Sequence, residues 1–111
     1  MEFTHLTVDV SHSRAELLGV LERNNPGRRI HLPPIDFARQ ETFIVAAGPR
    51  SSTGYALGVV RAEQKGGHVV VTVHERTPSL GEPVQARVTY PFLLLALDSD
   101  KPVHLKWPGR P

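Results

Sequence analysis

Alternating apolar and polar residues predict most of the regular structure of this chain. Residues 3–10 place Leu6, Val8 and Val10 on one face, which is the pattern of a half-buried strand. Residues 43–47 form a continuous apolar run that ends at a Gly-Pro pair. We therefore expect one strand near the N-terminus and another before residue 48.

Helical spacing is found in one segment. Ser13 is followed three residues later by Glu16, a capping box in which each side chain satisfies an unpaired backbone N–H at a helix start. Leu17 and Leu21 then repeat at helical spacing, and an Asn-Asn-Pro-Gly sequence ends the pattern. The sequence predicts one helix near residues 13–24.

A hairpin is predicted at the centre of the chain. Residues 55–64 and 68–76 flank a Gly66-Gly67 turn, and glycine accepts the positive φ that two-residue turns require. The pairs expected in this register are Val60 with Val73, Ala62 with Val71, Arg61 with Thr72 and Glu63 with Val70. A slip by one residue would bring a charged side chain into the apolar face.

The same register leaves two large side chains on the polar face. Tyr55 and Leu57 would both point away from the core if the strand were regular. Gly58 lies beside them, and a glycine inside a strand often marks a bulge. We therefore expect a bulge or sharp bend near Gly58 that turns these side chains inward.

Three further strands are predicted in the C-terminal part. Val84, Ala86, Val88 and Tyr90 alternate with polar residues, which predicts a half-buried strand. Residues 92–97 are short and continuously apolar, as in a strand buried on both faces, and residues 103–107 form a last short strand.

The predicted elements define a mainly β fold. Six or seven strands separated by turns favour an antiparallel β-sandwich or a partly open barrel, with one N-terminal helix against it. We expect a single domain over residues 1–111, with the helix near 13–24 and the β core over 35–107.

Composition excludes several classes of function. The chain has no cysteine, so it has neither disulfides nor a thiolate metal site. A net charge of +2 is little evidence for nucleic acid, and 6% aromatic residues are too few for a base-stacking platform, so we expect no nucleic-acid partner. Arg28, Arg29 and His31 lie in a loop over residues 27–34, which we interpret as a solvated connector, with a phosphate-contacting patch as the alternative.

The sequence offers no sign of membrane insertion. The first ten residues lack the basic segment and apolar core of a signal peptide, and no apolar run approaches the roughly 20 residues that span a bilayer. We expect a cytoplasmic protein, or an exported one if the sequence is a trimmed mature form.

Candidate chemistry is sparse. Among the six histidines, His68 and His74 share a strand face, but their separation of roughly 20 Å is too large for one metal ion. Ser51, Ser52 and Thr53 would be nucleophiles only with a histidine base within reach, and turn hydroxyls more often bond their own backbone. We therefore expect no catalytic residue, no metal and no cofactor.

The segment from Gly48 to Tyr55 is the strongest candidate for a binding site. Gly48 and Pro49 restrict the backbone to a defined turn between two strands, and polar loops on a rigid scaffold often carry recognition. The candidate partner-binding residues are Arg50, Ser51, Ser52, Thr53, Gly54 and Tyr55. Trp107 is either a core residue or an exposed anchor for a partner.

The order of these features resembles the C-terminal domain family of the protease complex subunit PrcB. The residues that carry the resemblance are Ile35-Asp36-Phe37, Gly48, Ser52-Thr53-Gly54-Tyr55, Gly66-Gly67, Val69 to Val73, the loop from Pro78 to Gly81, and Thr89-Tyr90-Pro91-Phe92. Thr53 departs from the family, which usually has a glycine there. Members of the family are exported or lipid-anchored. The resemblance implies an accessory subunit that binds a protein partner, such as a protease or an envelope complex, and has no chemistry of its own.

Three alternatives stay open. Residues 52–55 are also similar to the Thr-Thr-Gly-Tyr loop of chagasin-type inhibitors of papain-like proteases, although the other two inhibitory loops of that family are not evident. A small hydrolase would use Ser51, Ser52 or Thr53. A homodimer would bury a large apolar two-fold interface.

Overall fold

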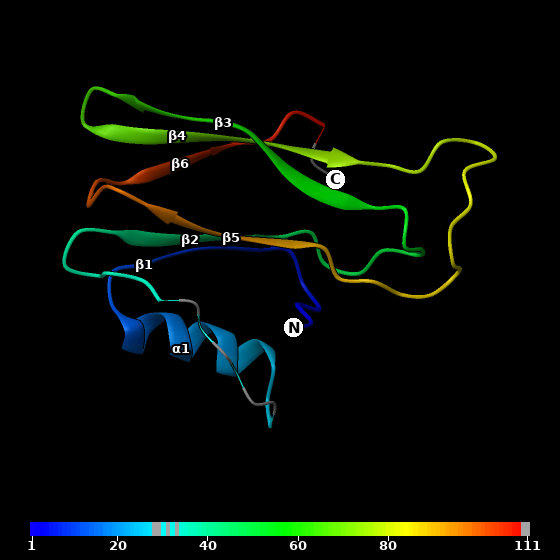
Figure 1. The fold of residues 1–111 in the computed structure, drawn as a ribbon, viewed down its shortest axis with the longest axis horizontal. Coiled ribbons are helices and arrows are strands. Elements are labelled where there is room, and N and C mark those ends of the chain that lie inside the picture. Colours follow the sequence, from blue (N-terminus) through cyan, green and yellow to red (C-terminus); the bar gives the residue numbers. More distant parts are fainter. Residues whose placement is uncertain (28–29, 31, 33, 110–111) are drawn as a thin grey trace.

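The computed structural model describes residues 1–27, 30, 32 and 34–109. Within this part of the chain, one helix and six strands form in the order shown in Figure 1. Their bounds are β1 (Thr7–Ser11), α1 (Arg14–Asn24), β2 (Glu41–Ala46), β3 (Ala56–Lys65), β4 (His68–Arg76), β5 (Phe92–Leu97) and β6 (Val103–Lys106).

The strands form two three-stranded sheets. The first sheet has the order β1-β2-β5 and the second has the order β3-β4-β6. The two sheets lie face to face, and α1 covers the outer face of the first sheet, so the fold has three layers (Figure 1). The predicted β-sandwich with one helix is confirmed, and no barrel closes.

One pairing differs from the antiparallel arrangement expected. β6 runs parallel to β4, whereas the pairs β1–β2, β2–β5 and β3–β4 are antiparallel. After β5 the chain leaves the first sheet and enters the second beside β4. Because this connection changes sheet, strand direction is not fixed by a hairpin.

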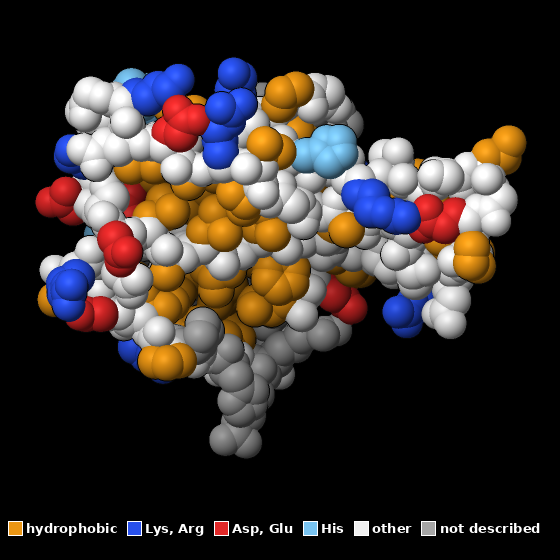
Figure 2. All heavy atoms as spheres, turned by 45° about the horizontal axis from the view of Figure 1, so that its top comes forward, with side chains coloured by type: hydrophobic (Ala, Val, Ile, Leu, Met, Phe, Trp, Pro, Cys, Tyr) orange, Lys and Arg blue, Asp and Glu red, His pale blue; other side chains and the backbone are white. Residues whose placement is uncertain are grey.

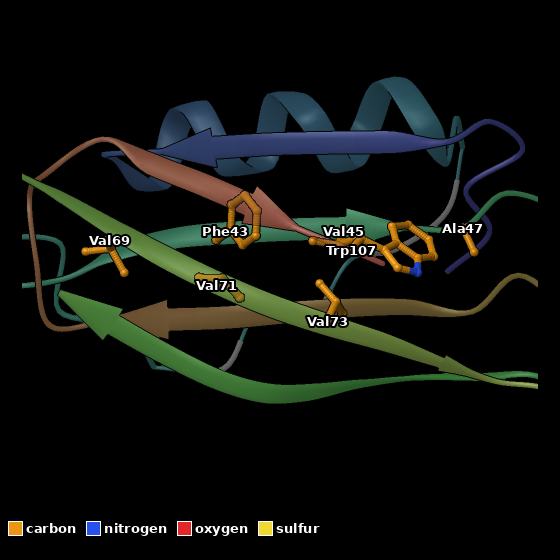
Figure 3. Packing of buried hydrophobic residues seen from close by; sticks show 7 residues of the cluster. All are labelled: Phe43, Val45, Ala47, Val69, Val71, Val73 and Trp107. Atoms are coloured by element: carbon orange, nitrogen blue, oxygen red, sulfur yellow. The ribbon is translucent and has the colours of Figure 1, made fainter. Parts of the chain in front are cut away.

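The core has two clusters that share β2. Phe43 and Val45 face the second sheet, where they pack with Val71 and Val73 (Figure 3). Ile44 and the rest of the opposite face pack against α1. β2 is therefore buried on both faces, which explains its continuous apolar sequence.

Trp107 belongs to the core. Its side chain is 8% exposed and lies in the cluster between the sheets (Figure 3). The choice between a core residue and an exposed anchor is therefore decided in favour of the core.

The helix start follows the predicted capping box with one difference. Ser13 Oγ accepts a hydrogen bond from the backbone N–H of Glu16 at 3.1 Å, and Glu16 Oε2 accepts one from the N–H of His12 at 3.3 Å. The Glu16 side chain thus binds the N–H of the residue before the N-cap, and not that of Ser13 itself. Leu17 and Leu21 are buried against the first sheet, as the helical spacing predicted.

The central hairpin confirms three of the four predicted pairs. Arg61 lies opposite Thr72, Ala62 opposite Val71, and Glu63 opposite Val70. The fourth pair is wrong, because Val59, not Val60, lies opposite Val73. The register shifts between Val59 and Arg61, so the expected bulge is present and falls two residues beyond Gly58. Leu57 consequently packs against the core.

Two strand predictions are corrected. Residues 84–90 do not form a strand, and Val84 and Val88 are 39% and 58% exposed. This segment makes a single β-bridge, between Thr89 and Arg50, because its other backbone bonds go to an irregular turn. β5 is only partly buried, since it is at the edge of its sheet and not at its centre.

Two further expectations concern the ends of elements and loops. The first strand begins at Thr7, and Phe3 is instead buried in the helix-side cluster beside Phe92. Arg28, Arg29 and His31, named above as a connector or phosphate patch, lie outside the described residues. Within the described residues, α1 is too short to cross a membrane.

Candidate functional site

Two connections meet at one end of the sandwich. The segment 48–55 joins β2 to β3, and residues 77–91, which we call the arm, join β4 to β5. Because β2 pairs with β5 and β3 pairs with β4, both connections emerge at the same end. The arm extends beyond the strands there, and the turn lies beside it (Figure 1).

Arg50 fixes the turn to β4. Its guanidinium donates two hydrogen bonds to the Glu75 carboxylate, from Nε to Oε2 at 2.6 Å and from Nη2 to Oε1 at 3.0 Å. Nη1 also donates to the carbonyl oxygens of Ala47 and Pro49. The Arg50 and Glu75 side chains are only 16% and 12% exposed. Hydrogen bonding to Glu75 raises the pKa of Arg50, so the guanidinium keeps its charge.

Backbone hydrogen bonds then join the turn to the arm. Arg50 and Thr89 exchange N–H···O bonds of 2.8 and 2.9 Å, and the Thr89 hydroxyl donates to the carbonyl of Ser52 at 2.7 Å. The N–H of Thr53 donates to the carbonyl of Gln85, and Thr53 Oγ1 accepts from the N–H of Gln85. The polar atoms of the turn therefore take the place of a neighbouring strand for residues 85–89.

Gly54 allows the turn and the arm to make direct contact. A Cβ atom at this position would lie 2.5 Å from Pro78 Cβ and 2.8 Å from Val84 Cγ1. Real side chains do not approach so closely, so only glycine fits without displacing the arm. The carbonyl of Gly54 also accepts a 2.8 Å hydrogen bond from Arg76 Nη1, which fixes the turn to the end of β4.

The structure brings the six candidate residues together but gives them different roles. Ser52 and Gly54 are buried, Arg50 and Tyr55 are partly buried, and Ser51 and Thr53 are exposed. The chagasin-like match covers residues 52–55, so two of its four residues have little surface to offer a protease cleft.

Two hydroxyl groups of the turn, those of Ser52 and Thr53, accept hydrogen bonds from backbone N–H groups. Ser52 Oγ accepts from the N–H of Gly54 at 3.3 Å, and Thr53 Oγ1 accepts from Gln85. Among the described residues, no histidine is hydrogen-bonded to Ser51, Ser52 or Thr53. The serine–histidine or threonine–histidine hydrogen bond on which the hydrolase alternative depends is therefore not formed among these residues.

Sequence patterns alone do not identify the arm as part of the site. Its residues divide between a loop and a predicted half-buried strand, and Glu75 lies within the predicted strand 68–76. The Pro- and Gly-rich sequence from Pro78 to Pro83 indicated a turn, but which segment it would contact depends on the pairing of distant strands.

A polar cavity lies near the beginning of β2 and the end of β5. It has a volume of about 380 Å³, and the residues that line it are His12, Phe37, Ala38, Arg39, Gln40, Asp98, Ser99 and Asp100. No group of three or more histidine, aspartate or glutamate side chains within the described residues is placed to hold a metal ion. The cavity is polar and open, unlike the apolar pockets that bind small molecules.

Glu41 is buried near His12 and Asp100, two of the residues that line this cavity. Its side chain is fully buried, and neither carboxylate oxygen has a hydrogen-bond partner among the described residues. Burial raises the pKa of Glu41, the nearby His12 opposes this effect, and Asp100 adds to it. The folded protein therefore binds the proton of the Glu41 carboxyl group more tightly than the unfolded chain does.

This burial predicts a specific pH dependence of stability. Because the pKa of Glu41 is higher in the folded state than in the unfolded state, the free energy of unfolding should fall as the pH rises from about 4.5 through the raised pKa. Glu41→Gln, which cannot ionise, should remove this fall and be more stable than the parent at pH 8 by on the order of 1 kcal/mol. Urea unfolding at pH 5 and pH 8 measures the difference. Equal pH dependence in both proteins would show that the carboxylate is solvated.

The fold and this end of the molecule define a small β-sandwich that carries a turn and an arm locked together by hydrogen bonds. A model of the family described as PrcB C-terminal matches residues 42–98, just over half of the chain. The chain therefore belongs to the PrcB C-terminal family. The match includes the turn, the hairpin, the arm and β5, whereas α1 and residues 35–37 lie outside it. No curated protein and no solved structure matches the chain.

Proposed function

We propose that this protein is a protein-binding module without chemistry of its own, an accessory subunit of a protease or envelope complex. The partner would contact the end of the sandwich formed by the turn, residues 50–55, and the arm. Membership of the PrcB C-terminal family supports an accessory role in a protease complex. The residues that carry the contact are inferred from this chain alone.

The observation on which the proposal depends is the rigid joining of two loops. The bidentate ion pair of Arg50, the backbone bonds to Thr89 and Gln85, and the tight contact at Gly54 hold both loops in one conformation. A surface that is ordered before binding loses less conformational entropy when a partner is bound. In many proteins a rigid scaffold likewise positions the loops that bind a partner.

The exposed residue Ser51 offers a direct test. Tagged protein would be purified from the cells that produce it, and the proteins that remain bound would be identified. We expect Ser51→Arg to reduce recovery of the partner at least tenfold, because a long charged side chain would obstruct the contact. Gln64→Arg is the matched control, since Gln64 is exposed near the hairpin turn at the other end of β3.

Two results would contradict the proposal. The first is recovery of no stoichiometric partner with the parent protein. The second is recovery of the same partner, in the same amount, with Ser51→Arg. The expected loss of binding counts as support when the unfolding curve of Ser51→Arg matches that of the parent, so that lost binding is not mistaken for lost folding.

A further inference from the structure

The outer end of the arm is a tight turn. The N–H of Glu82 donates to the carbonyl of Ser79 at 3.0 Å, and Gly81 has a φ of +84°. A glycine with positive φ at the third position is the pattern of a type II turn, which places Leu80 at the second position. Leu80 is therefore held at the corner of the turn, where its side chain projects away from the arm.

Glu82 holds this turn closed. Its Oε1 atom accepts hydrogen bonds from the N–H of Ser79 at 3.2 Å and from Arg76 Nη2 at 2.6 Å. The hydrogen bond from Arg76 lowers the pKa of Glu82, so the carboxylate stays charged and bound. Arg76 belongs to β4 and also binds the carbonyl of Gly54, so the tip of the arm is connected to the sandwich and to the turn.

Apolar side chains of the arm remain in solvent. Leu80 is fully exposed, and Val84 and Val88 are exposed to a lesser degree. Figure 2 shows apolar side chains at the outer end of the arm, separate from those nearer the sheets. Val84 lies against Gly54 of the turn and Tyr90 is partly buried, so the apolar exposure of the arm is concentrated at Leu80 and Val88.

We infer that Leu80 is the anchor residue of the partner contact and that it inserts into an apolar pocket on a partner protein. The inference rests on the proposed function and adds the residue and the chemistry that would recognise the partner. A leucine-sized pocket suits the geometry, because the fully exposed Leu80 side chain projects from a turn that the hydrogen bonds of Glu82 hold in place.

A second copy of the chain fits this surface less well. A second copy would have to offer an apolar pocket for Leu80, but the cavities at residues 36–40 with 98–100 and beside β3 are lined mostly by charged and polar side chains. A projecting side chain on an ordered loop suits an apolar pocket on a different protein, where burial of a few central residues supplies most of the affinity.

The test uses the partner identified with the parent protein, purified and titrated with the full chain. Leu80→Ser should weaken binding at least tenfold, whereas Leu80→Met, which keeps the apolar volume, should bind within about threefold of the parent. Neither variant should change the unfolding curve, because the Leu80 side chain is fully exposed.

The results for the two variants together show whether the anchor, the proposed binding end or both are wrong. If Ser51→Arg weakens binding and Leu80→Ser does not, the anchor is overturned and the binding end stands. If neither variant affects binding, or if the parent has no partner, both are overturned. If the parent sediments as a dimer and Leu80→Ser as a monomer, Leu80 serves self-association and the pocket on a partner protein is ruled out.

Discussion

Arg50→Ala is expected to lower the free energy of unfolding by about 3 kcal/mol. The substitution leaves the Glu75 carboxylate mostly buried without the guanidinium that binds it at 2.6 and 3.0 Å. Removing one member of a buried ion pair costs more than the pair contributes, because the remaining charge is neither solvated nor paired. Urea unfolding of the parent and the variant at pH 7 measures the loss.

The same substitution should also loosen the arm. Alanine keeps the backbone groups that bind Thr89, but it lacks the side chain that holds residue 50 to β4, so the contact between turn and arm should open more often. We expect faster amide hydrogen exchange at Thr53 and Thr89, whose N–H groups donate across this contact.

An exposed ion pair on β3 provides the matched control. Arg61 is hydrogen-bonded to Glu63 at 3.1 Å, but the Arg61 side chain is 63% exposed. Arg61→Ala should therefore change the free energy of unfolding by about 0.5 kcal/mol or less. Equal losses in Arg50→Ala and Arg61→Ala would mean that the Arg50 pair is as well solvated as a surface pair. Arg50→Lys, which keeps the charge but not the two-pronged geometry, should fall between the parent and Arg50→Ala.

Trp107→Ala is expected to cost about 3–5 kcal/mol of stability. The indole ring fills the space between the sheets beside Ala47 and Val73, and alanine would leave a cavity there (Figure 3). Small domains are stable by only about 5–15 kcal/mol, so the variant should be close to unfolding at 37 °C. Because Trp107 is the sole tryptophan, unfolding must be followed by far-ultraviolet circular dichroism and not by fluorescence.

A smaller aromatic ring tests the cause of this loss. Trp107→Phe keeps part of the buried volume and should lose less than half as much stability as Trp107→Ala. In the parent protein, tryptophan emission should shift to longer wavelength on unfolding, as expected for a ring that leaves an apolar environment. A loss below about 1 kcal/mol in Trp107→Ala would place the ring at the surface.

Local patterns in the sequence were sufficient for most of the elements. The capping residues Ser13 and Glu16 act within four residues of each other, so the start of α1 depends on nothing distant. The Gly66-Gly67 turn fixed the register of the nearest pairs, and Arg61 lies opposite Thr72 as predicted. The predicted pair of Val60 with Val73 is wrong because one extra residue is inserted into β3 at the bulge, farther from the turn. Such an insertion changes which residues pair but leaves the apolar pattern of the sequence unchanged.

The segment 84–90 shows where local patterns misled. Its alternation is that of a half-buried strand, but within the described part of the chain it pairs with no strand, and the irregular turn at residues 50–53 supplies its hydrogen bonds instead. The same turn was correctly singled out as a defined structure. Its buried and exposed residues could not be told apart, because Ser52 and Gly54 are buried by a segment that follows more than twenty residues later.

The sequence by itself determined the class of fold, the helix and its cap, the hairpin, and the family, because each depends on short-range spacing or on an ordered set of residues. Only the tertiary structure decided that β6 runs parallel to β4, that Glu41 is buried with no hydrogen-bond partner among the described residues, and that Arg50 reaches Glu75. These features join residues far apart in the chain, and which distant groups meet depends on how the two sheets pack. The binding end proposed here has the same origin, since it is formed where two separate connections lie side by side.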